Sequence, residues 1–222
     1  MIALRRATLV ARRELFAERA HPDGLAAALT FTGLLVLLES LAFGPGRARE
    51  PDVAGAAFWI AVTFAAILVA TRSFDREIED DAIDAVLVLP GGRDALYAGK
   101  VLALAIVLVI VAATTGVLSV FVNSLEVALA AQLVLVTILG VLALAPVIVI
   151  VSLLALRVRA RVALVPILAF PMLVPQLVAG TNGAAAALAG DATAAVGWSA
   201  LLAVFALLYG VLGLTLTPGA FD

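Results

Sequence analysis

The chain has 222 residues, of which 64% are hydrophobic and 14% are charged, and its formal net charge is −2. Soluble domains carry about 25% charged residues, so this composition, with a mean hydropathy of +1.20, excludes an ordinary globular domain. The chain contains no cysteine, which excludes disulfides and thiolate catalysis or metal sites. Its charge pattern indicates no nucleic-acid partner.

Long apolar runs dominate the sequence. A helix needs about 20 apolar residues to cross the hydrocarbon core, and it satisfies its own backbone hydrogen bonds in lipid. We therefore predict an all-α membrane protein with one membrane domain over residues 23–222. Trp59 and Trp198 are expected to anchor spans at the membrane interface. The six predicted spans cover about 24–43, 53–71, 101–122, 127–154, 162–180 and 197–217.

Basic residues are distributed unevenly between the connections. Five lie in residues 1–22, four in 72–100 and three in 155–161, which leaves two of the fourteen elsewhere. Because Lys and Arg accumulate on the cytoplasmic side, we expect both termini in the cytoplasm. The predicted location is the cytoplasmic (inner) membrane of a bacterium or archaeon.

The N-terminal arm, residues 1–22, is rich in arginine and ends at Pro22. It is predicted to form an interfacial helix on anionic membrane lipid, although Leu9 and Phe16 interrupt its arginine sector. The alternative is a solvated arm that only sets the orientation of the chain.

Residues 74–89 show the pattern of an amphipathic helix between the second and third spans. Its apolar positions recur at helical spacing: Phe74, Ile78, Ala82, Ala85 and Leu89. Asp80 and Asp84 fall on the opposite side, and Pro90 ends the pattern. The segment is longer than a simple connection requires, which favours a docking element for a cytoplasmic partner. The alternative is a solvated helix that only separates the two spans.

The fifth predicted span contains Pro166, Pro171 and Pro175. Each proline removes a backbone donor and kinks or breaks a helix, and membranes tolerate this where neighbouring groups or cavity water compensate. Two interpretations stand side by side: a broken, moving helix near a translocation path, and a static kink at a helix interface.

Catalytic and metal-binding patterns are absent from the sequence, and we predict no enzyme activity in this chain. Its single histidine, His21, lies in the N-terminal arm. Gly99-Lys100 resembles the end of a phosphate-binding loop, but Asp94 and Val101 stand where that motif requires Gly and Ser or Thr. The chain is therefore not expected to hydrolyse ATP by itself, and no resident cofactor is predicted.

Six segments of the chain, taken in order, form a recognisable set: FGPG (43–46), AAFWIA (56–61), RSFDREIEDDAIDAVLVLP (72–90), GKV (99–101), LAFPMLVPQLVAG (168–180) and LTLTP (214–218). With this set, the six spans and the basic N-terminal arm, the chain resembles the heme exporter protein B family (CcmB), the permease subunit of the ABC-type cytochrome c maturation system. The chain departs from the usual family pattern at Asp81, Asp84 and Gly92, where the family usually has Gly, Glu and a second Pro.

The resemblance implies an ABC-2-type permease fold with an interfacial N-terminal helix and a cytoplasmic coupling helix. It also implies a homodimer, a CcmA-like ABC ATPase, CcmC-like and CcmD-like membrane subunits and, indirectly, a CcmE-like heme chaperone. Heme would be a transient cargo. Under this interpretation, ATPase coupling falls to Phe74, Ile78, Asp80, Asp84, Leu89 and Pro90.

The implied function is heme export, or release of the heme-loaded chaperone, in cytochrome c biogenesis. The absence of an evident heme-ligand pair favours mechanical transmission of ATP-driven motion over direct passage of heme. An ABC-2-type permease for a lipid, drug or polysaccharide would share every physical feature above. A membrane scaffold without an ATPase is a third alternative.

Overall fold

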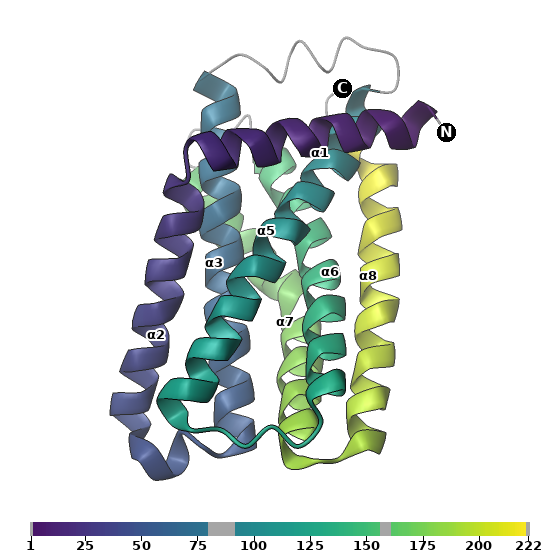
Figure 1. Cartoon of the computed structure of the whole chain (residues 1–222). Helices are drawn as coiled ribbons and strands as arrows, with labels where there is room; N and C mark the ends of the chain where they lie inside the picture. The colour runs from purple at the N-terminus through teal and green to yellow at the C-terminus, as the bar shows by residue number, and fades with distance from the viewer. Residues whose placement is uncertain (1, 80–91, 156–160, 221–222) are drawn as a thin grey trace.

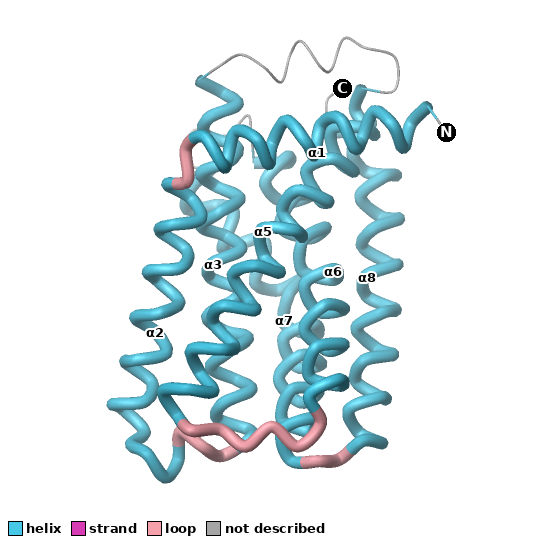
Figure 2. Tube along the Cα trace, viewed as in Figure 1, coloured by secondary structure: helices cyan, strands magenta, loops and turns pink. Residues whose placement is uncertain are grey.

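The computed structural model describes residues 2–79, 92–155 and 161–220, and this part of the chain is helical apart from short connections (Figures 1 and 2). The connections among the described residues, at 21–22, 48–50, 124–129 and 190–191, are short, as expected when little backbone is left outside the spans. The helices are α1 (Ile2–Ala20), α2 (Asp23–Arg47), α3 (Pro51–Glu79), α5 (Gly92–Asn123), α6 (Ala130–Ala155), α7 (Arg161–Ala189) and α8 (Ala192–Ala220).

Six of the described helices are long and apolar enough to cross a membrane. This confirms the predicted all-α fold with six spans. The segments that meet the length and hydropathy requirement are Asp23–Gly44, Pro51–Phe74, Asp94–Asn123, Ala130–Ala155, Leu164–Ala189 and Ala192–Leu216.

Helix α6 lies inside the bundle and packs against α3, α5, α7 and α8. Its sequence contains no charged residue, and every residue from Ala143 to Leu153 is buried. A helix that is apolar on all sides is suited to such an enclosed position. Helices α2 and α8 lie at the edges of the bundle and expose apolar side chains, including Leu41 and Leu207.

Helix α1 lies crosswise over one end of the bundle and packs against α5 (Figure 1). We call this the basic end, because it carries the arginine-rich α1 and Lys100. The close packing depends on Gly99, where an added Cβ would lie 2.9 Å from the carbonyl oxygen of Ala7. A larger residue at position 99 would push α1 away from the bundle.

The opposite end of the bundle is built from tight turns. Gly44 has a φ of +71° and ends the straight part of α2, a conformation that glycine adopts without steric cost. Gly190, with a φ of +86°, ends α7, and Asp191 caps α8 by accepting a hydrogen bond from the Ala194 N–H at 2.9 Å. Helix α8 therefore begins at Ala192, five residues before the predicted span.

Trp59 does not anchor the protein at the membrane interface, so that prediction was wrong. Its side chain is only 2% exposed and lies against Gly140 of α6 and Gly180 of α7. Two glycines on neighbouring helices leave the space that the indole ring fills. Trp198 is partly buried, and its Cβ lies close to Gly183.

Helix α7 runs from Arg161 to Ala189 through all three of its prolines, Pro166, Pro171 and Pro175. The segment is thus one helix in this structure, without a break at any proline. Motion of this helix during transport stays a prediction.

Candidate functional site

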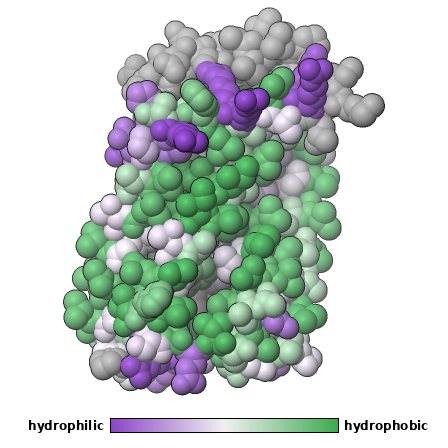
Figure 3. Space-filling model, in the orientation of Figure 1, coloured by the Kyte–Doolittle hydropathy of each residue, from purple (hydrophilic) through white to green (hydrophobic). Residues whose placement is uncertain are grey.

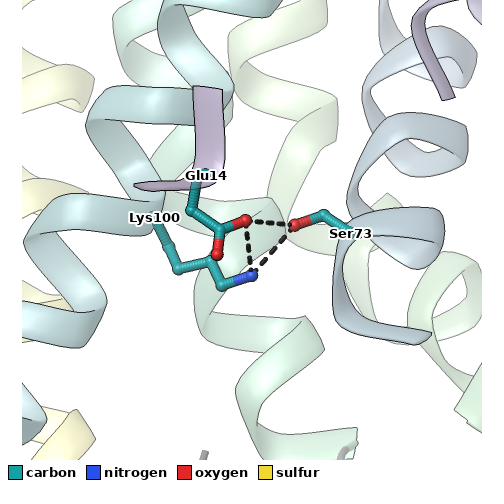
Figure 4. A network of polar contacts seen from close by, with 3 residues as sticks. All are labelled: Glu14, Ser73 and Lys100. Carbon is teal, nitrogen blue, oxygen red and sulfur yellow. Dashed lines mark hydrogen bonds and ion pairs between the residues drawn. The ribbon is translucent and has the colours of Figure 1, made fainter. Parts of the chain in front are cut away.

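Three helices meet at a buried polar cluster formed by Glu14 of α1, Ser73 of α3 and Lys100 of α5 (Figure 4). The Lys100 Nζ lies 3.0 Å from the Glu14 Oε2 as an ion pair, and it donates a hydrogen bond to the Ser73 Oγ at 2.9 Å. The Ser73 hydroxyl donates to the same Glu14 oxygen at 2.9 Å. Each side chain thus contacts the other two, so the cluster joins all three helices.

The cluster is shielded from water. Lys100 is 3% exposed and Glu14 is 12% exposed. The Lys100 ammonium also lies 4.4 Å from the centre of the Phe74 ring, an arrangement that attracts a cation to the ring face. A buried charge that keeps its partner is tolerated, but removing one partner costs about 3–5 kcal/mol. The relative positions of these helices are therefore energetically constrained.

A second buried carboxylate fixes the turn from α1 into α2. Glu18 is 7% exposed, and its Oε1 accepts a hydrogen bond from the Leu25 N–H at 2.7 Å. Glu14 and Glu18 are four residues apart, so both lie on the face of α1 that is turned toward the bundle. Both acids of this arginine-rich helix therefore bind groups inside the protein, at Lys100 and at the Leu25 N–H.

A small pocket of about 30 Å³ lies beside the cluster. This volume has room for about one water molecule, and it is far too small for a heme. Within the described residues, no group of three or more His, Cys, Asp or Glu side chains is placed to hold a metal ion. The pocket is lined by Glu14, Glu18, Ser73, Phe74, Lys100 and Val149, together with further apolar residues.

The arrangement is suited to passing motion between helices. Ser73 and Phe74 lie near the end of α3, which continues to Glu79, directly before residues 80–91. A displacement of this end of α3 would be felt by α1 and α5 through one desolvated cluster. These side chains are therefore suited to linking the three helices mechanically.

Comparison with protein families supplies the identity of the chain. A family model described as CcmB protein matches residues 5–221. The chain belongs to the CcmB family. Comparison with curated proteins finds no match. Membership makes the chain a membrane permease subunit of the heme exporter system in cytochrome c maturation. It works beside an ATPase and other membrane subunits, as a multi-pass protein of the inner membrane.

One of the predicted coupling residues of this CcmB-family chain lies at the cluster. Phe74 is 4% exposed and contacts Lys100. Ile78 belongs to α3, but its side chain lies outside the described residues. Asp80, Asp84, Leu89 and Pro90 lie outside the described residues altogether. Their role in coupling stays a prediction. The three prolines lie on α7 and do not line the pocket.

The sequence analysis did not identify Glu14, Ser73 or Lys100 as functional residues. A readable signal was present for Lys100, because a single lysine followed by a long apolar run is costly to place at membrane depth without a partner. Glu14 and Glu18 gave a second signal, as acids four residues apart in an otherwise basic arm. What remained hidden was the crossing of α1 over α5, which pairs residues 86 positions apart.

Proposed function

We propose that this CcmB-family subunit transmits the motion of a CcmA-like ABC ATPase to the membrane helices, and that the cluster of Glu14, Ser73 and Lys100 is the transmitting joint. The ATPase would engage residues 74–89, with Phe74, Ile78 and Leu89 seating the segment and Asp80 and Asp84 meeting basic groups of the partner. The observation that carries the proposal is the buried ion pair of Lys100 and Glu14, which ties α1 and α5 to the end of α3.

The proposal includes an orientation. The basic end would face the cytoplasm, because the arginines of α1, Arg72 and Lys100 gather there and basic residues favour that side. The chain would act as a homodimer with CcmC-like and CcmD-like subunits. Its output would be heme export or release of a heme-loaded CcmE-like chaperone, with heme as a transient cargo.

The orientation has a direct test because the chain contains no cysteine. Arg19→Cys places one thiol at the basic end, and Asp191→Cys places one at the opposite end; both positions are exposed. A membrane-impermeant maleimide applied to cells with a permeable outer envelope should label only Asp191→Cys before lysis. Labelling of Arg19→Cys alone would show that the basic end faces away from the cytoplasm, opposite to the proposed orientation.

The transmission is tested by complementation of a deletion strain. Covalently bound heme in c-type cytochromes is measured, with b-type cytochromes as the internal control. The variant Lys100→Met should lose most c-type cytochrome while the subunit still co-purifies with the ATPase. Lys100→Arg should retain more activity, because it keeps the positive charge. Arg72→Met, which removes an exposed cation near the end of α3, should behave as wild type.

Two results would contradict the proposal. If Lys100→Met accumulates to the wild-type protein level and gives a normal amount of c-type cytochrome, the cluster is not the transmitting joint. Intact c-type cytochromes in the deletion strain would contradict a role of this subunit in cytochrome c biogenesis and would favour an ABC-2-type permease for another cargo. If Lys100→Met fails to accumulate, Ser73→Ala deletes one hydroxyl only, and it should lower the yield of c-type cytochrome at normal protein level.

A further inference from the structure

Both tyrosines of the chain form hydrogen bonds between helices. The Tyr97 hydroxyl on α5 donates a hydrogen bond to the Tyr209 carbonyl on α8 at 3.0 Å. The Tyr209 hydroxyl in turn donates to the Met172 carbonyl on α7 at 3.3 Å. The two contacts form a chain that runs from α5 through α8 to α7, and we call this chain the tyrosine link.

Tyr97 is tightly packed where α5 meets α8. Its side chain is only 2% exposed, and Gly213 of α8 lies against its ring and hydroxyl. A Cβ added at position 213 would overlap the Tyr97 side chain, so a residue without a side chain is what permits this close approach. A displacement of Tyr97 is therefore passed to α8 by direct contact as well as by the hydrogen bond.

The tyrosine link begins beside the cluster of Glu14, Ser73 and Lys100. Tyr97 and Lys100 are three residues apart on α5, so they lie on adjacent turns of the helix. Lys100 binds groups on α1 and α3, whereas Tyr97 binds a group on α8. One short stretch of α5 thus connects α1 and α3 to α8.

The link ends at a weak turn of α7. Pro171 and Pro175 have no N–H, so the carbonyls of Ile167 and Pro171 lose their usual helical donor. Met172 lies between these two prolines. Sharp bends in helices form most readily at such positions. The Tyr209 hydroxyl therefore binds α7 at the turn where this helix bends most easily.

The tyrosine link lies among the membrane-spanning segments. Tyr97, Met172 and Tyr209 all belong to spans, and in the space-filling view the surface of the bundle is largely apolar between its two hydrophilic ends (Figure 3). Hydrogen bonds between helices contribute to helix association in such surroundings. The link is therefore suited to resisting a displacement and to passing it on.

We propose that Tyr97 and Tyr209 are positioning residues that carry motion from the Lys100 cluster to the proline-bearing turn of α7. While both hydrogen bonds are intact, the link holds this turn in its present conformation. A displacement of α5 shifts α8 and releases the Met172 carbonyl, which lets α7 bend. The inference rests on the proposed function, because it requires the cluster to move with the ATPase. Of the two interpretations of the proline-rich span, it selects the moving helix.

The test measures deuterium exchange of backbone amides in the complex purified with its ATPase, with and without ATP trapped by vanadate. The reporter is an α7 peptide that covers Met172 and Gln176. Nucleotide should accelerate its exchange in the wild type, because bending opens helical hydrogen bonds. Tyr97→Phe, which removes the hydrogen bond to α8, should abolish this acceleration while ATP hydrolysis continues. A purely structural role of Tyr97 would leave the acceleration in place.

Tyr209→Phe acts on the last contact of the link. Exchange of the same peptide should be about fivefold faster without nucleotide, the factor that corresponds to the loss of one typical hydrogen bond, and nucleotide should add no further acceleration. This variant carries the test if Tyr97→Phe fails to accumulate. The matched control is Ser199→Ala, which removes a buried hydroxyl of α8 that donates within its own helix, to the Ala195 carbonyl at 2.7 Å. It should respond as the wild type does.

Comparison with Lys100→Met separates this inference from the proposed function. If the nucleotide response is lost in Lys100→Met but persists in Tyr97→Phe, the tyrosine link is overturned and the cluster remains the joint. If it is lost in Tyr97→Phe but persists in Lys100→Met, the link stands and the cluster is not the joint. A response that persists in both variants, or that is missing in the wild type, would overturn the link.

Discussion

The indole ring of Trp59 on α3 lies directly against the backbone of Gly180 on α7. A Cβ added at Gly180 would approach the Trp59 Cε2 to 2.7 Å, which is closer than such contacts normally come. Gly140 on α6 bounds the same ring from another helix. The indole therefore holds three spans in one arrangement, and the glycines are necessary for it.

Replacing Gly180 by alanine should destabilise the protein. The added methyl group must displace a buried ring, and overpacking of this kind costs about 1–3 kcal/mol. Thermal unfolding in detergent, followed by size-exclusion chromatography after heating, should show a lower midpoint. Gly197→Ala is the matched control, because no described residue beyond its own helical turns lies within 4 Å of a Cβ there. Its unfolding midpoint should be unchanged or slightly raised.

Apolar replacement of Thr63 or Gln176 should stabilise the protein, in contrast to the alanine substitution at Gly180. Gly55 faces Ala184 and Trp59 faces Gly180 across α3 and α7, so the next turn of this antiparallel pair brings Thr63 opposite Gln176. Both side chains are buried, and none of the described residues forms a hydrogen bond with the Thr63 hydroxyl or the Gln176 amide. Apolar replacement of unpaired buried groups is often stabilising. Thr63→Val or Gln176→Leu should therefore raise the unfolding midpoint.

The control for this prediction is Thr32→Val. Thr32 is equally buried, but its hydroxyl donates to the Leu29 carbonyl at 3.2 Å. That change should be neutral or destabilising. A lowered midpoint for both Thr63→Val and Gln176→Leu would mean that these polar atoms are satisfied in the folded protein.

The pair of Lys100 and Glu14 should show strong coupling in a double-mutant cycle. Lys100→Met alone leaves a largely buried carboxylate and should cost about 3–5 kcal/mol of unfolding free energy. Adding Glu14→Leu should recover part of this loss, since apolar replacement of a whole buried pair is often tolerated. Additive effects of the two changes would show that the pair is weakly coupled.

Much of this fold follows from the sequence, because hydropathy alone locates six spans and helical spacing locates α1. Contacts between remote segments do not follow, since hydropathy cannot tell an interfacial Trp59 from one enclosed by Gly140 and Gly180. The cluster at Lys100 could not be predicted either, because it joins residues of three helices that are far apart in the sequence. The start of α8 was misplaced because its alanine-rich first turns carry a weak apolar signal, although Asp191 was a readable helix cap.

Asp191 should matter more than other acids at its end of the bundle. Its side-chain oxygen caps α8, and loss of such a cap costs roughly 1 kcal/mol. Asp191→Ala should lower the unfolding midpoint, while Asp191→Asn should preserve most of it because Asn caps equally well. Asp52→Ala, which removes an exposed acid from the first turn of α3, should have a smaller effect.

The enclosure of α6 has a consequence for how the bundle rearranges. A helix buried from Ala143 to Leu153 cannot rotate or slide without breaking contacts with several neighbours at once. Helix α2 lies at the edge of the bundle and exposes one apolar side, so we expect α6 to keep its position while helices at the edge of the bundle move against it. Its backbone amides in this stretch should be among the last to exchange with deuterium, whether the transporter is idle or turning over.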